Sequence, residues 1–154
     1  MNEIAELLQP EGVVAGLKAT NKRHLLQELA AAAARLTGAG ERAVLDVLIE
    51  RERLGTTGVG RGIAIPHAKI DGIARPVGLF ARLETPIDFE AVDDEPVDLV
   101  FLLIAPEGAG AEHLKALARV SRLLRDDELC RKLRGTKSAD ALYAVITSAR
   151  ARAA

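Results

Sequence analysis

The stretch VDLVFLLI, residues 97–104, is apolar at every position except Asp98. Its length matches a β-strand, and a strand that is apolar on both faces is typical of a sheet that is covered on both sides. Helices are the elements that cover such a sheet. We therefore predict an α/β fold of three layers, in one domain spanning residues 1–154, with this strand near its centre.

The residues after this run predict a loop and then a helix. Residues 105–110, APEGAG, are typical of a loop, and helical spacing begins near Ala111. His113 begins a stripe at helical intervals that continues through Leu117, Val120 and Leu124. The sequence therefore places a histidine in the first turn of a helix, at the exit of a central strand.

Two long helices are predicted earlier in the chain. The first runs from about Lys22 to Leu36 and is followed by Gly38, a C-terminal signal. The second runs from about Glu41 to Leu54, and an apolar stripe follows one of its faces: Val44, Val47 and Leu48. One turn further along this stripe lies Arg51, which we expect at the rim of the surface that the helix packs against.

Shorter elements complete the predicted fold. We expect a short helix that includes Ile4, Leu7 and Leu8, a strand from Val13 to Ala15, a strand from Val77 to Glu84 that Pro86 interrupts, and helices from Asp127 to Leu133 and from Ser138 to about Ala149. Ser138 is a suitable N-cap for the last helix because its hydroxyl can accept from a backbone N–H of the first turn.

Residues 56–68, TTGVGRGIAIPHA, combine a glycine-rich segment with a short apolar run and a histidine. Glycines at alternate positions permit close backbone approach, and Ile63 to Ile65 is typical of a short buried strand. Pro66 suits the end of a strand because it lacks a backbone donor. We therefore expect His67 to emerge where a sheet edge meets a loop, a common place for reactive side chains.

Composition excludes several classes of function. Hydrophobic residues make up 49% and charged residues 28%, the balance of a soluble globular protein. No apolar run is long enough to cross a membrane, and the absence of a signal peptide together with a single cysteine, Cys130, indicates a cytoplasmic protein. A net charge of -1 and an aromatic content of 3% do not suit a nucleic-acid-binding protein.

Spacing excludes several kinds of site. The glycines at 58, 60 and 62 precede a strand and lack the third glycine of a dinucleotide fingerprint, and Arg61-Gly62 stands where a P-loop has Lys and Ser or Thr. Single, scattered histidines and one cysteine predict no metal site. Ser121 and Cys130 lack the context of a hydrolytic nucleophile.

The three histidines differ in their expected surroundings. His24 lies on the polar side of its helix, so we expect a solvated surface role. His113 has two open interpretations, a site residue or a core histidine that satisfies a hydrogen bond. His67 is either a loop histidine without a chemical task or a nucleophile.

A neutral imidazole can attack phosphorus with one ring nitrogen while the other nitrogen holds a proton. The resulting phosphoramidate gives its phosphoryl group away readily, but its charge needs hydrogen-bond donors. The candidates are Arg51, His113, the hydroxyls of Thr56 and Thr57, and the backbone N–H groups of Gly58 and Gly60.

His67 is also part of a longer sequence pattern. An acidic residue, an aliphatic-Gly pair and an aliphatic-Ala-aliphatic-Pro-His-small run occur here as Glu52, Val59-Gly60 and residues 63–68, IAIPHA. This pattern resembles the phosphorylation signature of mannitol/fructose-type enzyme IIA proteins of the bacterial phosphoenolpyruvate phosphotransferase system. Further segments resemble the nitrogen-related branch, enzyme IIA-Ntr: RERLGTTG at 51–58, LETPIDF at 83–89, PVDL at 96–99, His113-Leu114 and CRKLR at 130–134.

The resemblance implies a mixed sheet between helix layers and a cytoplasmic phosphoryl relay. It implies that an HPr-like carrier phosphorylates Nε2 of His67, with Arg51 and His113 as neighbours of the phosphoryl group and no bound cofactor. Members of this branch act mostly as regulators through target proteins. The alternatives are a sugar-transport enzyme IIA that passes phosphate to a IIB domain, and a binding module of the same fold without phosphotransfer. The effect of Arg61 stays open.

Overall fold

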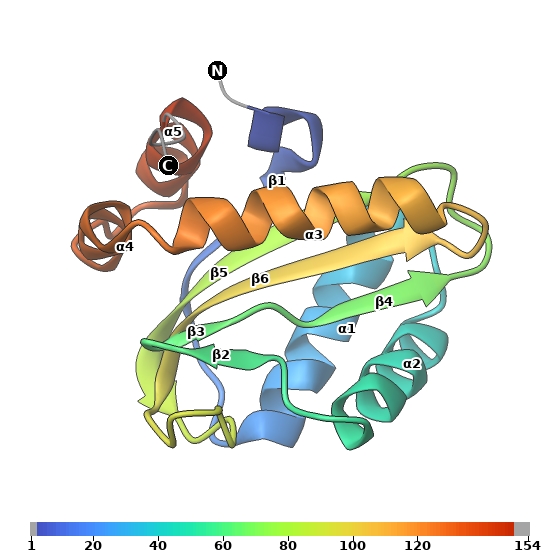
Figure 1. Cartoon of the computed structure of the whole chain (residues 1–154), viewed down its shortest axis with the longest axis horizontal. Helices are drawn as coiled ribbons and strands as arrows, with labels where there is room; N and C mark the ends of the chain where they lie inside the picture. Colours follow the sequence, from blue (N-terminus) through green and yellow to red (C-terminus); the bar gives the residue numbers. More distant parts are fainter. Residues whose placement is uncertain (1–2, 150–154) are drawn as a thin grey trace.

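The computed structural model describes residues 3–149, which form one sheet between two layers of helices (Figure 1). The strands are β1 (Leu8–Leu17), β2 (Gly58–Gly60), β3 (Ile63–Ala64), β4 (His67–Ile70), β5 (Val77–Ile87) and β6 (Val97–Pro106). The helices are α1 (Lys22–Thr37), α2 (Glu41–Arg53), α3 (Gly110–Leu124), α4 (Asp127–Arg134) and α5 (Ala139–Ser148), preceded by a 3-10 turn, η1 (Glu3–Glu6).

The sheet is mixed and β6 lies inside it. The strand order is β1-β5-β6-β3-β2, and β4 also pairs with β6 beyond the end of β3. β6 runs antiparallel to β5 and parallel to both β3 and β4. This arrangement confirms the predicted α/β class and the central position of residues 97–104.

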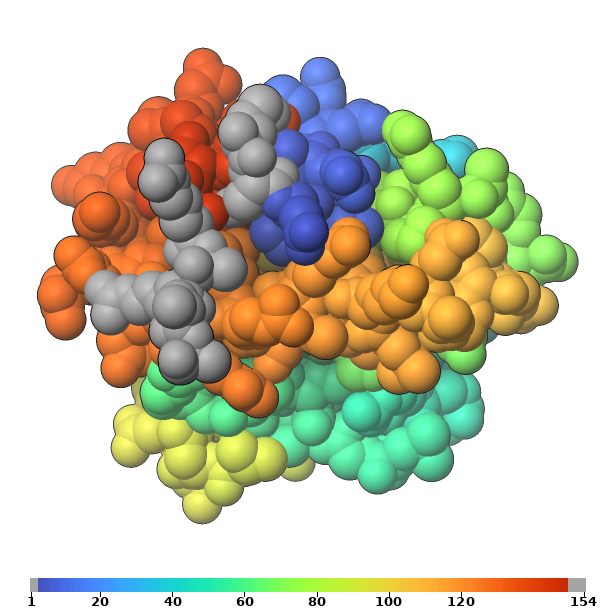
Figure 2. Space-filling model, turned by 45° about the horizontal axis from the view of Figure 1, so that its top comes forward, coloured from blue at the N-terminus to red at the C-terminus, as the bar shows by residue number. Residues whose placement is uncertain are grey.

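The two faces of β6 pack against different helices. Val100, Leu102 and Ile104 belong to a buried cluster that includes α1 and α2 residues such as Leu29 and Leu48. The alternate residues Leu99, Phe101 and Leu103 belong to a second cluster with residues from α3, α4 and α5. α3 packs on this second face, and in Figure 2 it lies as an orange band across the molecule. The alternation explains why both sides of this strand are apolar.

The N-terminal segment differs from the prediction. Only Glu3–Glu6 is helical, and a strand occupies Leu8–Leu17 in place of a helix through Leu8 and a strand from Val13 to Ala15. Pro10 and Gly12 lie within this strand rather than ending an element. They are tolerated because β1 is an edge strand and its register against β5 shifts between Leu8 and Val13, which leaves the intervening residues out of the regular ladder.

Pro86 does not end its strand, so the predicted interruption is also wrong. β5 continues to Ile87, which pairs with Val97 of β6. The register between β5 and β6 shifts between Arg82 and Ile87, so Pro86 lies in the irregular part of the ladder, where its missing N–H leaves no ladder bond broken. The predicted helices agree with the observed ones to within about one residue at most ends.

Gly78 provides a test of packing at the centre of the sheet. A Cβ atom at Gly78 would lie 2.7 Å from both Cε1 and Cζ of the fully buried Phe101. We expect Gly78→Ala to lower the free energy of unfolding by about 1–3 kcal/mol because the core has no room for the methyl group. Urea denaturation measures this change. Gly108→Ala is the control, since a Cβ there meets no atom within 4 Å, and equal stabilities of the two variants would contradict the packing argument.

Candidate functional site

Pro66 separates two short strands, and His67 is the first residue of the second. β3 ends at Ala64, and β4 begins at His67, which pairs with Leu103 of β6. His67 therefore opens an edge strand directly after the irregular residues Ile65 and Pro66, in agreement with the prediction that it emerges where a sheet edge meets a loop. Its side chain is only partly exposed, and its backbone is held by the sheet. A strand residue of this kind is more rigidly placed than a loop residue.

Two hydrogen bonds determine the tautomer of His67. Nδ1 lies 2.9 Å from the backbone oxygen of Ile65, which can only accept a hydrogen bond. Nε2 lies 3.2 Å from Nε of Arg51, which can only donate a hydrogen bond. Nδ1 therefore carries the ring proton, and Nε2 is unprotonated, with a lone pair that accepts from Arg51.

Arg51 reaches the histidine from the last turn of α2. Its Nη1 also donates to the backbone oxygen of Gly55 at 2.9 Å, so two contacts orient the guanidinium. Arg53, two residues further on, is exposed and pairs with Glu50 instead. The helical stripe had predicted a position for Arg51 at the rim of the surface that α2 packs against.

His113 approaches from the first turn of α3. Its ring centroid lies 5.6 Å from that of His67, with the two ring planes inclined by 52°. The residue is buried, and its Nδ1 has no hydrogen-bond partner among the described residues. The structure thus brings together side chains from β4, α2 and α3 that are distant in the sequence, with an unused polar atom beside them.

Both rings are neutral near pH 7 because burial disfavours their charged forms. Burial is the largest influence on the pKa of His67 and lowers it below the ordinary 6.5; the Ile65 carbonyl opposes this, the charge of Arg51 adds to it, and Glu52 opposes it. Burial likewise lowers the pKa of His113, helped by His67 and Lys69. The lone pair on Nε2 is therefore available at neutral pH.

This electrostatic setting predicts where His67 titrates. We expect a midpoint below pH 6.5 in a proton-nitrogen NMR titration, because the folded protein binds the proton less readily than free imidazole does. The signals should indicate the Nδ1–H tautomer from pH 6.5 upward. A midpoint above 6.5, or an Nε2–H tautomer at neutral pH, would contradict the geometry described above.

The four residues predicted to bind phosphate have other partners. The hydroxyl of Thr56 donates to the backbone oxygen of Phe89 at 3.3 Å and accepts from the backbone N–H of Gly58 at 3.1 Å. The buried hydroxyl of Thr57 donates to Glu52. Gly58 and Gly60 pair with β3. These contacts give the segment a structural task, and phosphate binding by any of the four stays a prediction.

Arg61 contacts the end of α3 and the start of α4. Its guanidinium donates to the backbone oxygens of Arg125 and Leu124 and pairs with Asp127 at 2.7 Å. Its backbone has φ 58, and its N–H donates to Asp93. The cation within the glycine-rich segment therefore fastens the turn between β2 and β3 to the helical layer.

Lys69 is a site neighbour that the sequence analysis missed. It lies two residues after His67 on β4, and its charge contributes to the lowered pKa of His113. The period-two alternation of a strand was the available signal, since it places residues 67 and 69 on the same face. His24, in contrast, is bonded to Thr20 and Glu28 on the surface of α1, in agreement with its predicted surface position.

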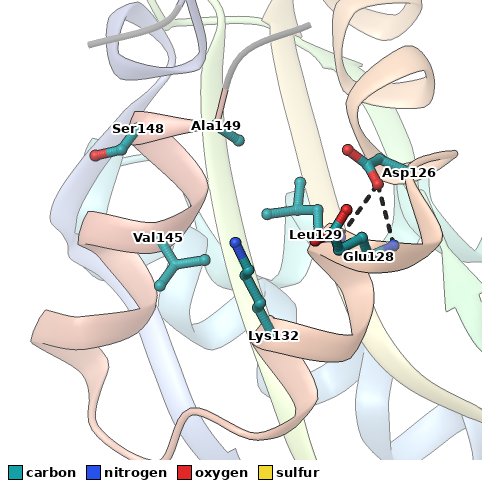
Figure 3. A pocket seen from close by; sticks show the side chains of 7 residues that line it. All are labelled: Asp126, Glu128, Leu129, Lys132, Val145, Ser148 and Ala149. Atoms are coloured by element: carbon teal, nitrogen blue, oxygen red, sulfur yellow. Dashed lines mark hydrogen bonds between the residues drawn. The ribbon is translucent and has the colours of Figure 1, made fainter. Parts of the chain in front are cut away.

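A separate hollow of about 310 Å³ lies between α4 and α5 (Figure 3). Its lining comes from these helices and their ends: Asp126, Glu128, Leu129, Lys132, Val145, Ser148 and Ala149. None of these residues belongs to the histidine site. Within residues 3–149, no helix is both long and apolar enough to cross a membrane.

Comparison with known proteins identifies the family. The family model described as "Phosphoenolpyruvate-dependent sugar phosphotransferase system, EIIA 2" matches residues 6–149. The chain belongs to this family. The fold is similar to that of IIA mannitol from Escherichia coli, with a TM-score of 0.76 at 22% identity, covering 90% of this chain and 97% of that one.

The EIIA 2 relatives include nitrogen regulatory proteins. One from Bradyrhizobium diazoefficiens is 58% identical over 151 residues, which cover 98% of this chain and 99% of that protein. One from Escherichia coli K12 is 37% identical over 146 residues, covering 94% and 90%. The crystal structure of IIA-Ntr from Neisseria meningitidis has a TM-score of 0.88 at 32% identity and covers 95% of this chain and 100% of that one. These matches confirm the predicted resemblance to the nitrogen-related branch.

Proposed function

We propose that this chain is a phosphocarrier of a nitrogen-related phosphotransferase system, which accepts a phosphoryl group on Nε2 of His67 and regulates other proteins according to its phosphorylation state. The observation that carries the proposal is the pair of hydrogen bonds on the His67 ring. They leave the proton on Nδ1 and the lone pair on Nε2, and Nε2 faces the Arg51 side chain.

The transfer step needs no bound cofactor. Nε2 of His67 donates its lone pair to the phosphorus atom of the phosphorylated donor, and the bond between phosphorus and the donor breaks with its electron pair remaining on the donor atom. The ring becomes positively charged as the new bond forms. The backbone oxygen of Ile65, 2.9 Å from Nδ1, stabilises the proton that the ring retains.

Arg51 and His113 are the proposed partners of the transferred group. Arg51 already points an N–H at Nε2, so a phosphoryl group bonded to that nitrogen would meet the guanidinium and take over its donors. The unpartnered Nδ1 of His113 is the second proposed donor, in the tautomer that protonates it. In this proposal the Arg51 cation and the neutral His113 ring stabilise the charge of the phosphoryl group. A cluster of several cations would bind the group too tightly for onward transfer.

The proposed donor is an HPr-like carrier protein. Leu54, which follows α2, and Leu114, which follows His113, are large apolar side chains that remain 85% and 68% exposed. Apolar side chains beside a reactive group are typical of a surface that meets another protein. We propose that the reaction takes place in the cytoplasm, where the expected donor is found.

The proposed output is regulation rather than delivery of phosphate to a sugar-specific IIB domain. Two relatives that match nearly the whole chain over nearly their own full length carry the name nitrogen regulatory protein, which supports this choice. A binding module of the same fold without phosphotransfer would not need the oriented Nε2 lone pair.

The test is incubation of the purified chain with enzyme I, an HPr-like carrier and labelled phosphoenolpyruvate. We expect a label that is lost in acid and retained in base, as a phosphoramidate requires. Omission of the HPr-like carrier should prevent labelling at equal enzyme I concentration. No label on the intact chain under these conditions would refute the phosphocarrier proposal, and pulldowns with the unphosphorylated chain would then identify targets of a binding module.

A further inference from the structure

An ion pair lies largely out of solvent beside the histidine site. Lys22 Nζ is 3.0 Å from Glu52 Oε1, and the two side chains are only 17% and 7% exposed. The ammonium group also lies 4.6 Å from the ring centroid of Phe89, a cation-π contact. Withdrawing two charges from water is unfavourable, so a pair like this needs further hydrogen bonds to be maintained.

Glu52 obtains those hydrogen bonds from one residue of the glycine-rich segment. Its Oε1 accepts from the backbone N–H of Thr57 at 3.1 Å, and its Oε2 accepts from the Thr57 hydroxyl. Thr57 is only 3% exposed, so water does not compete for these bonds. The carboxylate thereby holds both the backbone and the side chain of Thr57.

Thr57 transmits this constraint to the histidine. Its backbone oxygen accepts from the N–H of Ile65 at 2.9 Å, and the backbone oxygen of Ile65 in turn accepts a hydrogen bond from Nδ1–H of His67, also at 2.9 Å. Hydrogen bonds or an ion pair therefore join each residue to the next in a series that runs from Lys22 through Glu52, Thr57 and Ile65 to His67. Its last member is the carbonyl that determines which ring nitrogen is protonated.

We infer that Glu52, supported by Lys22, is a positioning residue for the reactive histidine: through Thr57 it holds the Ile65 carbonyl where that carbonyl keeps the proton on Nδ1 and so leaves Nε2 free to attack. The consequence for phosphotransfer rests on the proposed function, whereas the effect on the His67 ring does not. The negative charge of Glu52 also raises the pKa of His67, an effect separate from the hydrogen bonds.

This role distinguishes Glu52 from its neighbours on α2. Arg51 forms a hydrogen bond to the His67 ring directly, whereas the hydrogen bonds of Glu52 connect to it through Thr57 and Ile65. Glu50 is exposed and pairs with Arg53, so it belongs to no such series. Glu50 thus offers a matched control, with the same side chain on the same helix turn.

The experiment compares Glu52→Gln with Glu50→Gln by nitrogen NMR of the His67 ring at pH 7.5, followed by the rate of phosphoryl acceptance. For Glu52→Gln we expect a larger fraction of Nε2–H tautomer, a lower His67 pKa because an anion is lost, and acceptance slowed about tenfold. For Glu50→Gln we expect wild-type values. A loss of packing alone would change stability and leave the tautomer unaltered.

A second pair of variants covers the case in which Glu52→Gln does not fold. Lys22→Met keeps the aliphatic stem but removes the charge, and Lys22→Arg restores a cation for Glu52. We expect the Nε2–H tautomer to increase in Lys22→Met and to return towards the wild-type level in Lys22→Arg. An unchanged tautomer in both folded Lys22→Met and folded Glu52→Gln would overturn the inference.

The outcomes separate this inference from the proposed function. A changed tautomer in a chain whose wild type accepts no phosphoryl group would support the positioning role and refute the phosphocarrier. Normal phosphoryl acceptance by the wild type, with the His67 tautomer and the acceptance rate unaltered in Glu52→Gln, would support the phosphocarrier and refute the positioning role.

Discussion

Replacement of His67 by alanine is expected to abolish phosphoryl acceptance completely. Nε2 of this residue is the proposed attacking atom, and no other described side chain occupies its position at the start of β4 beside Arg51. The fold should persist, because the pairing of residues 67–70 with β6 uses backbone groups that alanine retains. The measurement is transfer of label from phosphoenolpyruvate through enzyme I and the HPr-like carrier, scored on gels kept at neutral pH.

His24→Ala is the matched control for this experiment. His24 lies on the surface of α1, bonded to Thr20 and Glu28, and should be dispensable for transfer. We expect the control to take up label at the wild-type rate. Label retained by His67→Ala would contradict the assignment and would require a different acceptor, with His113 the first to be tested.

Replacement of Arg51 by methionine is expected to slow phosphoryl acceptance by about 10²-fold while leaving His67 as the acceptor. Methionine preserves most of the apolar stem but removes the N–H groups that lie 3.2 Å from Nε2 and would bind the transferred group. Loss of one well-placed donor at a site of developing charge costs about 10²–10³ in rate. Removing the cation also raises the pKa of His67, since Arg51 helps to lower it.

Two further variants show whether this effect is specific. Arg53→Met removes an exposed arginine that pairs with Glu50, so we expect no change in transfer. Arg51→Lys keeps the charge without the planar fork, so its rate should lie between those of wild type and Arg51→Met. Equal rates for Arg51→Met and Arg53→Met would remove Arg51 from the proposed site.

Local sequence patterns predicted correctly the helix ends that depend on residues of a single helix. Gly38 ends α1 in a left-handed conformation and Ser138 caps α5, both as predicted. Strands were predicted less well than helices. Pro10 and Pro86 are compatible with β1 and β5 because register shifts occur there, and such shifts depend on the partner strand.

The candidate site also combines features that local sequence predicts with contacts that depend on how the elements pack. His67 and Arg51 can each be recognised as candidates from the residues of their own segment: the first follows a glycine-rich segment, and the second ends an apolar stripe. The contacts of Thr57 were not visible, because its hydroxyl has several possible partners and the choice of Glu52 depends on how α2 meets the glycine-rich segment. Its assignment to phosphate binding stays a prediction for this reason.

The sequence by itself determined the class of fold and predicted His67 as the attacking side chain, since apolar alternation, caps and the run IAIPHA act within a few residues of each other. The tertiary structure alone decided which nitrogen of His67 is free and which side chains face it. The physical reason is that the deciding groups come from separate elements. The Ile65 carbonyl is oriented by Thr57 and Glu52, Arg51 comes from α2, and His113 comes from α3, so they converge only when the two helix layers pack on the sheet.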